Sequence, residues 1–210
     1  MKKLIWFKGA KTGGSSLREI FCKQVYNISY ESVLKKGVTM EDYDITNKEF
    51  LWMPNTFWAE YYYNQNKETF NNAIIICSIR HPIDRFLSGC RHFKLDPNTL
   101  IDNMPIKLDE KIWVHLGQSI HNFLLDGKVR PHYWIRQESL IKDTQAFCDA
   151  FRKHDERFNV RLKNIHKNIS RKRKWDISEE TKQKILNFFE KDLKYFNNAS
   201  SDNAYFLESL

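Results

Sequence analysis

A glycine- and serine-rich loop near the start of the chain carries residue types that bind phosphate. It reads Lys8-Gly-Ala-Lys-Thr-Gly-Gly-Ser-Ser-Leu17. In the Walker A pattern G-x-x-x-x-G-K-[ST], the lysine after the second glycine reaches the phosphates of a nucleoside triphosphate. Here Gly9 and Gly14 have the required separation, but Ser15 occupies the position of that lysine, and Lys11 lies four residues earlier. The spacing predicts an anion-binding loop whose lysine acts at a different point of the ligand.

The residues on either side of this loop predict a strand and a helix. The apolar run Leu4–Phe7 is typical of a buried strand, and the residues from Ser16 onward have helical spacing. Such a turn directs backbone N–H groups and the positive end of a helix dipole at one place. The alternative is an ordinary strand–helix turn capped by a serine. As an anion site, the loop offers two glycines at which the backbone can approach a ligand closely, Gly13 and Gly14. It also offers three hydroxyl groups, those of Thr12, Ser15 and Ser16.

A second polar motif follows another apolar run. Ala73–Ile79 is rich in β-branched residues, as expected for a strand buried on both faces of a parallel sheet. Arg80 follows this run directly, and Pro82 is well placed in the first turn of a new helix. Ser88 then lies about two turns into that helix. We therefore expect Arg80 at the carboxyl end of a buried strand.

Strands and helices are expected to alternate along the chain. Phe50–Met53 and Tyr133–Arg136 also predict strands, and Thr56–Lys67 and Ile112–Leu125 predict helices. This alternation is typical of βαβ units, in which ligands bind at the carboxyl edge of a parallel sheet. We expect a three-layer α/β fold, P-loop-NTPase-like, with a central parallel sheet of four to five strands flanked by helices. Both polar motifs then lie on one edge of the sheet.

The C-terminal region predicts one further helix. Ser178 is a suitable N-cap for a helix over Glu179–Phe196, whose apolar residues recur with the spacing of a core-facing stripe. The tail 197–210 is expected to be weakly ordered. With 210 residues, the chain is long enough to bury a substantial core, and residues 1–210 are expected to form a single domain.

The net charge of +8 is concentrated in one segment. Residues 151–175 contain ten Lys/Arg and two acidic residues, which predicts either a surface for an anionic partner or a solvated basic face. No apolar stretch approaches the roughly 20 residues of a membrane span, and no signal peptide is evident. The four cysteines are scattered without a C-x-x-C pair, which argues against a zinc site and indicates a cytoplasmic protein.

Together, the two polar motifs resemble those of the sulfotransferases that use 3′-phosphoadenosine 5′-phosphosulfate (PAPS). The resemblance is to the carbohydrate-type branch, such as the 2-O-sulfotransferases. Lys11–Leu17 is similar to the 5′-phosphosulfate loop of this family, commonly P-K-T-G-[GT]-[ST]-S-L. Arg80 with Ser88 is similar to its 3′-phosphate motif, and Ile135–Asp143 is similar to its R-x-E-x-L-x-x-D segment.

This resemblance implies an enzyme that transfers a sulfuryl group from PAPS to an acceptor hydroxyl on a glycan or glycoconjugate and releases adenosine 3′,5′-bisphosphate. It implies that Lys11 stabilises charge on the oxygen between sulfur and phosphorus. No metal is implied, and no Walker B aspartate ends the Ala73–Ile79 run. Asn168–Trp175 is similar to the family's C-terminal region, whose basic run would close over the nucleotide. The implied donor-binding residues are Lys11, Thr12, Gly13, Gly14, Ser15, Ser16, Arg80, Ser88, Arg171, Lys172, Arg173 and Lys174.

Two positions depart from the family pattern. Ala10 replaces the proline before the loop lysine, and no histidine follows the Phe50–Met53 run, where relatives often carry the base that deprotonates the acceptor. Glu60 follows that run at a suitable depth and is the first candidate for this base. His115 and His132 are the next candidates.

Two other functions stay open at this point. A P-loop kinase or nucleotide hydrolase of similar fold would bind ATP tightly with Mg²⁺. A non-catalytic protein would bind a polyanion or nucleic acid through the basic segment 151–175, with a steep salt dependence and no need for Lys11. Aromatic residues are sparse in that segment, so we expect no nucleic-acid partner. The sequence does not indicate the oligomeric state or the particular acceptor.

Overall fold

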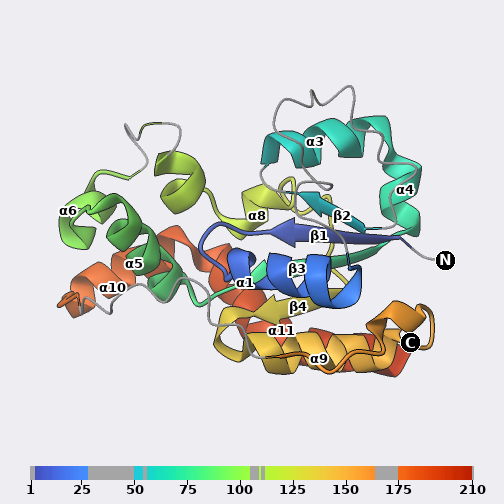
Figure 1. Ribbon diagram of the computed structural model, residues 1–210. Helices are drawn as coiled ribbons and strands as arrows, with labels where there is room; N and C mark the ends of the chain where they lie inside the picture. Colours follow the sequence, from blue (N-terminus) through green and yellow to red (C-terminus); the bar gives the residue numbers. More distant parts are fainter. Residues whose placement is uncertain are drawn as a thin grey trace.

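A small parallel sheet forms the centre of the computed structural model, which describes residues 3–27, 50–53, 56–104, 109, 112–163 and 175–209. Its four strands have the order β2-β1-β3-β4, and every neighbouring pair is parallel (Figure 1). They span Leu4–Lys8 (β1), Phe50–Met53 (β2), Ile74–Ile79 (β3) and Tyr133–Arg136 (β4). The predicted α/β fold, a parallel sheet flanked by helices, is confirmed.

Helices pack on both faces of the sheet because the central strands are apolar on both sides. One face packs against Gly14–Glu19 (α1), the π-helix Ile20–Val25 (η1) and Leu140–Phe151 (α9). The opposite face packs against Thr56–Gln65 (α3), Lys67–Asn72 (α4) and Ile120–Phe123 (α8). Successive residues of β1 alternate between the two cores, with Trp6 in the first and Phe7 in the second. Two buried layers therefore hold the sheet rigid between its helices.

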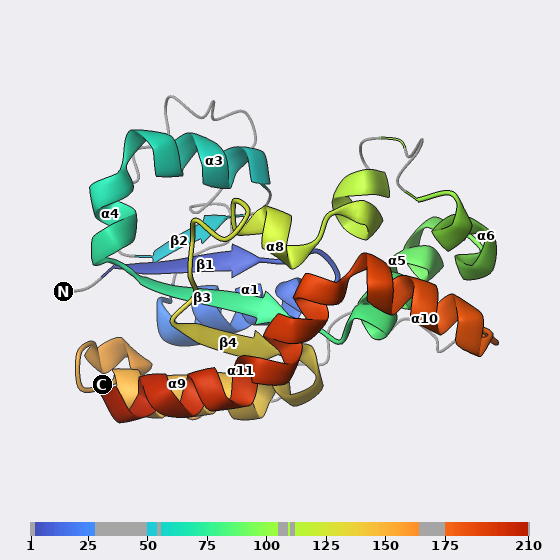
Figure 2. The same ribbon diagram turned by 180° about the vertical axis from the view of Figure 1, so that it is seen from behind.

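The C-terminal helix α11 (Glu190–Ser209) lies beside the edge strand β4 (Figure 2). The amide of Asn203 accepts a hydrogen bond from Trp134 N at 2.7 Å and donates one to Trp134 O at 2.8 Å. It thereby satisfies backbone groups that a further strand would otherwise bond. The expectation of a weakly ordered tail at 197–210 is wrong for 197–209, because this side chain and the buried Phe206 attach the tail to the sheet.

A group of helices lies beyond the carboxyl ends of the strands (Figures 1 and 2). Its elements are Pro82–Phe93 (α5), Pro97–Asp102 (α6), the π-helix Trp113–Gly117 (η2) and Glu179–Phe188 (α10). They share a core of their own, which includes Phe86, Leu116, Ile185 and Phe189. Two short 3₁₀ turns complete the described elements, at Gln137–Ser139 (η3) and Glu156–Phe158 (η4).

Three predicted helices are each interrupted in the structure. The helix expected over Thr56–Lys67 ends at Gln65, and α4 begins at Lys67. The helix expected over Ile112–Leu125 is divided between η2 and α8, and Ser119 caps α8 by accepting a hydrogen bond from Asn122 N. The helix expected over Glu179–Phe196 is divided at Phe189. Ser178 caps α10 as predicted, by accepting a hydrogen bond from Thr181 N.

Candidate active site

The loop between β1 and α1 adopts backbone conformations that suit a tight turn. Lys11 has φ 61° and Gly13 has φ 84°, both in the left-handed region. Gly13 is the N-cap residue of α1, and no side chain caps this helix. Ser15 and Ser16 therefore lie in the first turn of the helix, and the alternative of a turn capped by a serine is not what the structure shows.

Thr12 attaches this loop to the neighbouring strand. Its side chain is completely buried, and its hydroxyl donates to Gly9 O at 2.7 Å and is hydrogen-bonded to Ser78 Oγ, also at 2.7 Å. Because the hydroxyl has two partners inside the protein, it is not available as the ligand donor that the sequence suggested. Thr12 instead fixes the loop against the carboxyl end of β3.

The segment that follows β4 packs against the same loop. A Cβ atom added to Gly13 would lie 2.6 Å from Leu140 Cδ1 and 3.2 Å from Gln137 Cγ. Since Gly13 also has a positive φ, an L side chain here would be both strained and obstructed. The loop is therefore held between β3 on one side and the turn after β4 on the other.

Asp143 organises the corner where β4 passes into α9. Its carboxylate accepts two hydrogen bonds from the Arg136 guanidinium, each of 2.8 Å, and one from Arg136 N at 3.0 Å. This bidentate contact raises the pKa of Arg136. In the same segment, Glu138 Oε1 accepts a hydrogen bond of 3.0 Å from His81 N. The Arg136–Asp143 segment thus joins the turn after β4 to the start of α5.

Lys11 and Arg80 lie next to each other at the carboxyl edge of the sheet. Arg80 Nη1 donates to Lys11 O at 3.4 Å. Burial lowers the pKa of Lys11, and the positive charges of Arg80 and Arg91 lower it further. Burial also lowers the pKa of Arg80, against the opposing effects of Asp84 and Glu138. The structure therefore brings the two motifs predicted from the sequence to one place, where positive charge is partly desolvated.

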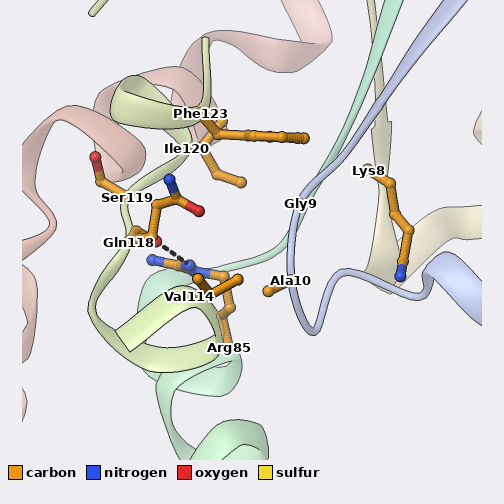
Figure 3. A pocket seen from close by; sticks show the side chains of 9 residues that line it. All are labelled: Lys8, Gly9, Ala10, Arg85, Val114, Gln118, Ser119, Ile120 and Phe123. Atoms are coloured by element: carbon orange, nitrogen blue, oxygen red, sulfur yellow. Dashed lines mark hydrogen bonds between the residues drawn. The ribbon is translucent and has the colours of Figure 1, made fainter. Parts of the chain in front are cut away.

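Lys8, which the sequence analysis did not single out, adds another cation to the loop. A Cβ atom added to Gly14 would lie within 2.3–2.8 Å of three carbons of the Lys8 side chain, so this side chain passes directly over Gly14. Burial lowers the pKa of Lys8 to about 8, and Arg18 and Lys11 contribute to the shift. Figure 3 shows Lys8 on the opposite side of the loop from Val114 and Arg85. A basic residue at the very end of β1 was the signal that could have identified it.

Arg91 is a second cation that sequence reasoning missed. It lies in the last turn of α5, three residues after the half-buried Ser88. Residues three apart are neighbours on a helix surface, so the Ser88 and Arg91 positions are adjacent. Within the described part of the chain, the Nε atoms of Arg80 and Arg91 are both buried without a hydrogen-bond partner.

The candidates for the general base lie in three different places. Glu60 is exposed on α3, and among the described residues it makes no hydrogen bond or ion pair with the loop. His115 belongs to η2, and its ring stacks on that of His92 at a centroid distance of 5.9 Å. His132 lies at the amino end of β4, where its Nδ1 accepts from Ile75 N at 3.0 Å. His132 is therefore excluded as the base, because it lies at the wrong edge of the sheet.

A small pocket lies between the loop and η2 (Figure 3). Its lining includes Gly9, Ala10, Val114 and Arg85, and its volume is about 10 Å³. This is at the lower limit for one water molecule, so the pocket is not large enough for an acceptor. It does show that η2, the helix that contains Val114 and His115, lies beside the loop.

The predicted basic run Arg171–Lys174 lies outside the described residues. Within the described ranges, no His, Cys, Asp and Glu side chains gather in a group of three or more that could hold a metal ion. The helices of these ranges also lack the combination of length and apolar character that a bilayer span requires. No protein-family model, curated protein or solved structure matches this chain.

Proposed function

We propose that this protein is a sulfotransferase with a P-loop-like donor site, which moves a sulfuryl group from PAPS to a hydroxyl of a carbohydrate acceptor. The observation that carries the proposal is the proximity of Lys11 and Arg80 at the carboxyl edge of the sheet, where Arg80 Nη1 donates to the backbone oxygen of Lys11 and the charge of Arg80 lowers the pKa of Lys11. A loop lysine beside an arginine at the end of β3 supplies cations for two anionic groups of one nucleotide. A magnesium-dependent P-loop enzyme would instead hold an acidic residue at the end of this strand.

In the proposed reaction, the acceptor oxygen attacks sulfur in line with the departing phosphate oxygen. The new S–O bond forms as the S–O bond to the phosphate breaks, and negative charge develops on the oxygen that leaves. Lys11 stabilises that charge, because a cation held in a partly desolvated site acts more strongly than one in water. Arg80 and Ser88 bind the 3′-phosphate, and this contact positions the nucleotide so that its 5′-phosphosulfate lies at the loop.

The proton of the acceptor hydroxyl passes to a base in this scheme. His115 is the better of the two remaining candidates, because it belongs to η2, the helix that lines a pocket together with Gly9 and Ala10 of the loop. Glu60 has no comparable link to the loop. Stacking on His92 holds the His115 ring in a defined orientation.

The decisive experiment compares the binding of two nucleotides. Isothermal titration calorimetry should show that adenosine 3′,5′-bisphosphate binds without a metal and more tightly than ATP with Mg²⁺. Tighter, Mg²⁺-dependent binding of ATP would favour a kinase or nucleotide hydrolase. Failure of both nucleotides to bind, together with salt-sensitive binding of polyanions, would favour a non-catalytic protein.

Replacing Arg80 should discriminate between nucleotides that differ only in the 3′-phosphate. We expect Arg80→Ala to lower the affinity for adenosine 3′,5′-bisphosphate roughly 10- to 100-fold, because the substitution removes a charge-assisted contact with the phosphate. The affinity for adenosine 5′-phosphate should change by no more than a few-fold. Calorimetry with both nucleotides measures the difference, and an equal loss for the two would contradict the role given to Arg80.

Binding of the nucleotide should also depend on pH through Lys8. The Lys8 pKa of about 8 means that its amine loses its proton in the free protein as the pH rises above 8. A bound anion favours the charged form and raises this pKa, so binding takes up a proton between pH 8 and 10. The affinity should fall about tenfold between pH 7 and pH 9.

Calorimetry at pH 8.5 in two buffers of different ionisation enthalpy measures this proton uptake. Lys8→Met keeps an unbranched side chain over Gly14 but removes the charge, and it should abolish most of the uptake. Equal proton uptake in the variant and the wild type would show that Lys8 does not sense the nucleotide.

A further inference from the structure

Two arginine side chains of the candidate site bury N–H groups without a partner. The Nε atoms of Arg80 and Arg91 are both inaccessible to water and unbonded within the described residues. Leaving a buried donor unpaired costs about 1–3 kcal/mol, and more when the group is charged. Arg85 on α5, whose Nε is also unbonded, pairs with the Asp192 carboxylate and with Gln118 O through its other guanidinium nitrogens. Among the described residues, by contrast, the Arg80 side chain bonds Lys11 O alone and the Arg91 side chain bonds none. The unpaired donors of Arg80 and Arg91 therefore require a different explanation.

The positions of these side chains indicate a common ligand. Arg80 precedes α5, and Arg91 lies in its last turn, next to the Ser88 position on the helix surface. The charge of Arg91 lowers the pKa values of both Lys11 and Arg80, so the three cations lie within electrostatic range of one another. Cations that repel each other are stabilised when an anion binds between them.

The charge of the expected ligand also requires another cation. A phosphate monoester carries about −1.5 to −2 charges at pH 7. Arg80 supplies one positive charge, and Ser88 supplies none. A site with Arg80 and Ser88 alone would therefore leave part of the phosphate charge uncompensated in a partly desolvated place.

We propose that Arg91 completes the binding site for the 3′-phosphate, together with Arg80 and Ser88. This inference rests on the proposed function, since the ligand is the 3′-phosphate of the sulfuryl donor. Arg91 binds the phosphate oxygens that Arg80 leaves free and balances the second negative charge. It thereby makes the site selective for nucleotides that carry a 3′-phosphate monoester.

The experiment measures the affinities of the wild type and of three variants of the full chain for two nucleotides. The nucleotides are adenosine 3′,5′-bisphosphate and adenosine 5′-phosphate, and the variants are Arg91→Gln, Arg91→Lys and Arg130→Gln. Arg130 is exposed just before β4, at the amino edge of the sheet, so Arg130→Gln makes the same change in net charge away from the site. Calorimetry gives the affinities, and circular dichroism shows whether each variant is folded.

Arg91→Gln is expected to lower the affinity for adenosine 3′,5′-bisphosphate about 10- to 100-fold. The affinity for adenosine 5′-phosphate should stay within about twofold of the wild-type value. Arg91→Lys keeps the charge without the planar fork, so it should weaken the bisphosphate several-fold only. Arg130→Gln should match the wild type. If the glutamine variant does not fold, the lysine variant decides the question by the same selectivity.

Other outcomes would overturn the inference. An unchanged affinity for the bisphosphate, or an equal loss for both nucleotides, would remove Arg91 from the 3′-phosphate site. The proposed function would still stand if the wild type binds the bisphosphate and Arg80→Ala loses it selectively. If the wild type does not bind adenosine 3′,5′-bisphosphate at all, both proposals fail.

Discussion

Lys11→Ala should lower the rate of sulfuryl transfer by at least about 100-fold, the effect of removing one group that stabilises charge in a transition state. Affinity for adenosine 3′,5′-bisphosphate should stay within about tenfold of the wild type. The two effects differ because charge on the leaving oxygen develops only as the bond to sulfur breaks. In the proposed mechanism, Arg80 and the loop backbone still hold the nucleotide in the variant. Transfer is measured with labelled PAPS and a set of carbohydrate acceptors, and binding is measured by calorimetry.

Lys23→Ala is the matched control for this variant. Lys23 is exposed on η1 and forms an ion pair with Glu19, so its removal should change neither transfer nor binding measurably. Alanine at position 11 must adopt the same left-handed backbone conformation as lysine, so the strain of the loop is similar in both proteins. Full transfer activity in Lys11→Ala would contradict the mechanism.

Asp192→Ala should destabilise the fold more than any surface substitution, by about 3–5 kcal/mol. Asp192 is fully buried and accepts hydrogen bonds from Arg85 Nη2 at 3.0 Å and from Ile120 N at 2.9 Å. Its other oxygen accepts from His121 N at 3.2 Å. Removing this carboxylate leaves a buried guanidinium uncompensated between α5, α8 and α11. For a chain of this size, the melting temperature should fall by roughly 6–20 °C.

Asp102→Ala provides the matched comparison, because Asp102 forms an exposed ion pair with Lys184 at 2.7 Å. That pair joins two helices but is exposed to solvent, so its loss should cost no more than about 1 kcal/mol. Thermal denaturation followed by circular dichroism measures both variants. Equal melting temperatures for Asp192→Ala and Asp102→Ala would show that the buried pair does not stabilise the fold.

A double-mutant cycle with Arg85→Met tests the pairing itself. Without the guanidinium, the Asp192 carboxylate no longer neutralises a buried positive charge. Asp192→Ala should therefore lower the free energy of unfolding by less in the Arg85→Met background than in the wild type. Arg85 also packs against the Phe189 ring, with its guanidinium carbon 4.4 Å from the ring centroid. Methionine keeps part of that apolar contact, which makes it a better replacement than alanine.

The buried pair also influences the candidate site, because Arg85 and Arg91 belong to the same helix. Asp192 fixes the orientation of α5 relative to α11 through Arg85. The helix in turn carries Ser88 and Arg91 and begins two residues after Arg80. A variant that loosens the Arg85–Asp192 contact should therefore also weaken binding of the 3′-phosphorylated nucleotide.

Local patterns in the amino-acid sequence were sufficient to predict the four strands and to place Lys11 and Arg80 after two of them. Strands such as Ile74–Ile79 are continuous apolar runs, and this local pattern needs no knowledge of distant contacts. Because the sheet is parallel, residues directly after β1 and β3 must lie on the same edge. Lys11 and Arg80 follow these two strands, which explains why their proximity was predictable.

The positions at which the helices end depend on contacts between elements that are distant along the chain. Phe189 interrupts the predicted C-terminal helix, and the interruption places Asp192 between Arg85 and the backbone of α8. The order of the tail likewise depends on Asn203, which bonds the backbone of a strand about 70 positions earlier. No periodicity in the sequence reports such contacts, because they join elements that are distant along the chain.

Which side chains of the site are available to a ligand likewise depends on contacts between distant elements. Thr12 reads as a ligand hydroxyl in the loop pattern, but Ser78 and Gly9 O occupy it inside the protein. Lys8 and Arg91 read as ordinary basic residues, and only packing shows that their polar groups are partly removed from water. Residue spacing predicts which side chains share a sheet edge, whereas burial and partner choice depend on the neighbours that the fold brings to each group.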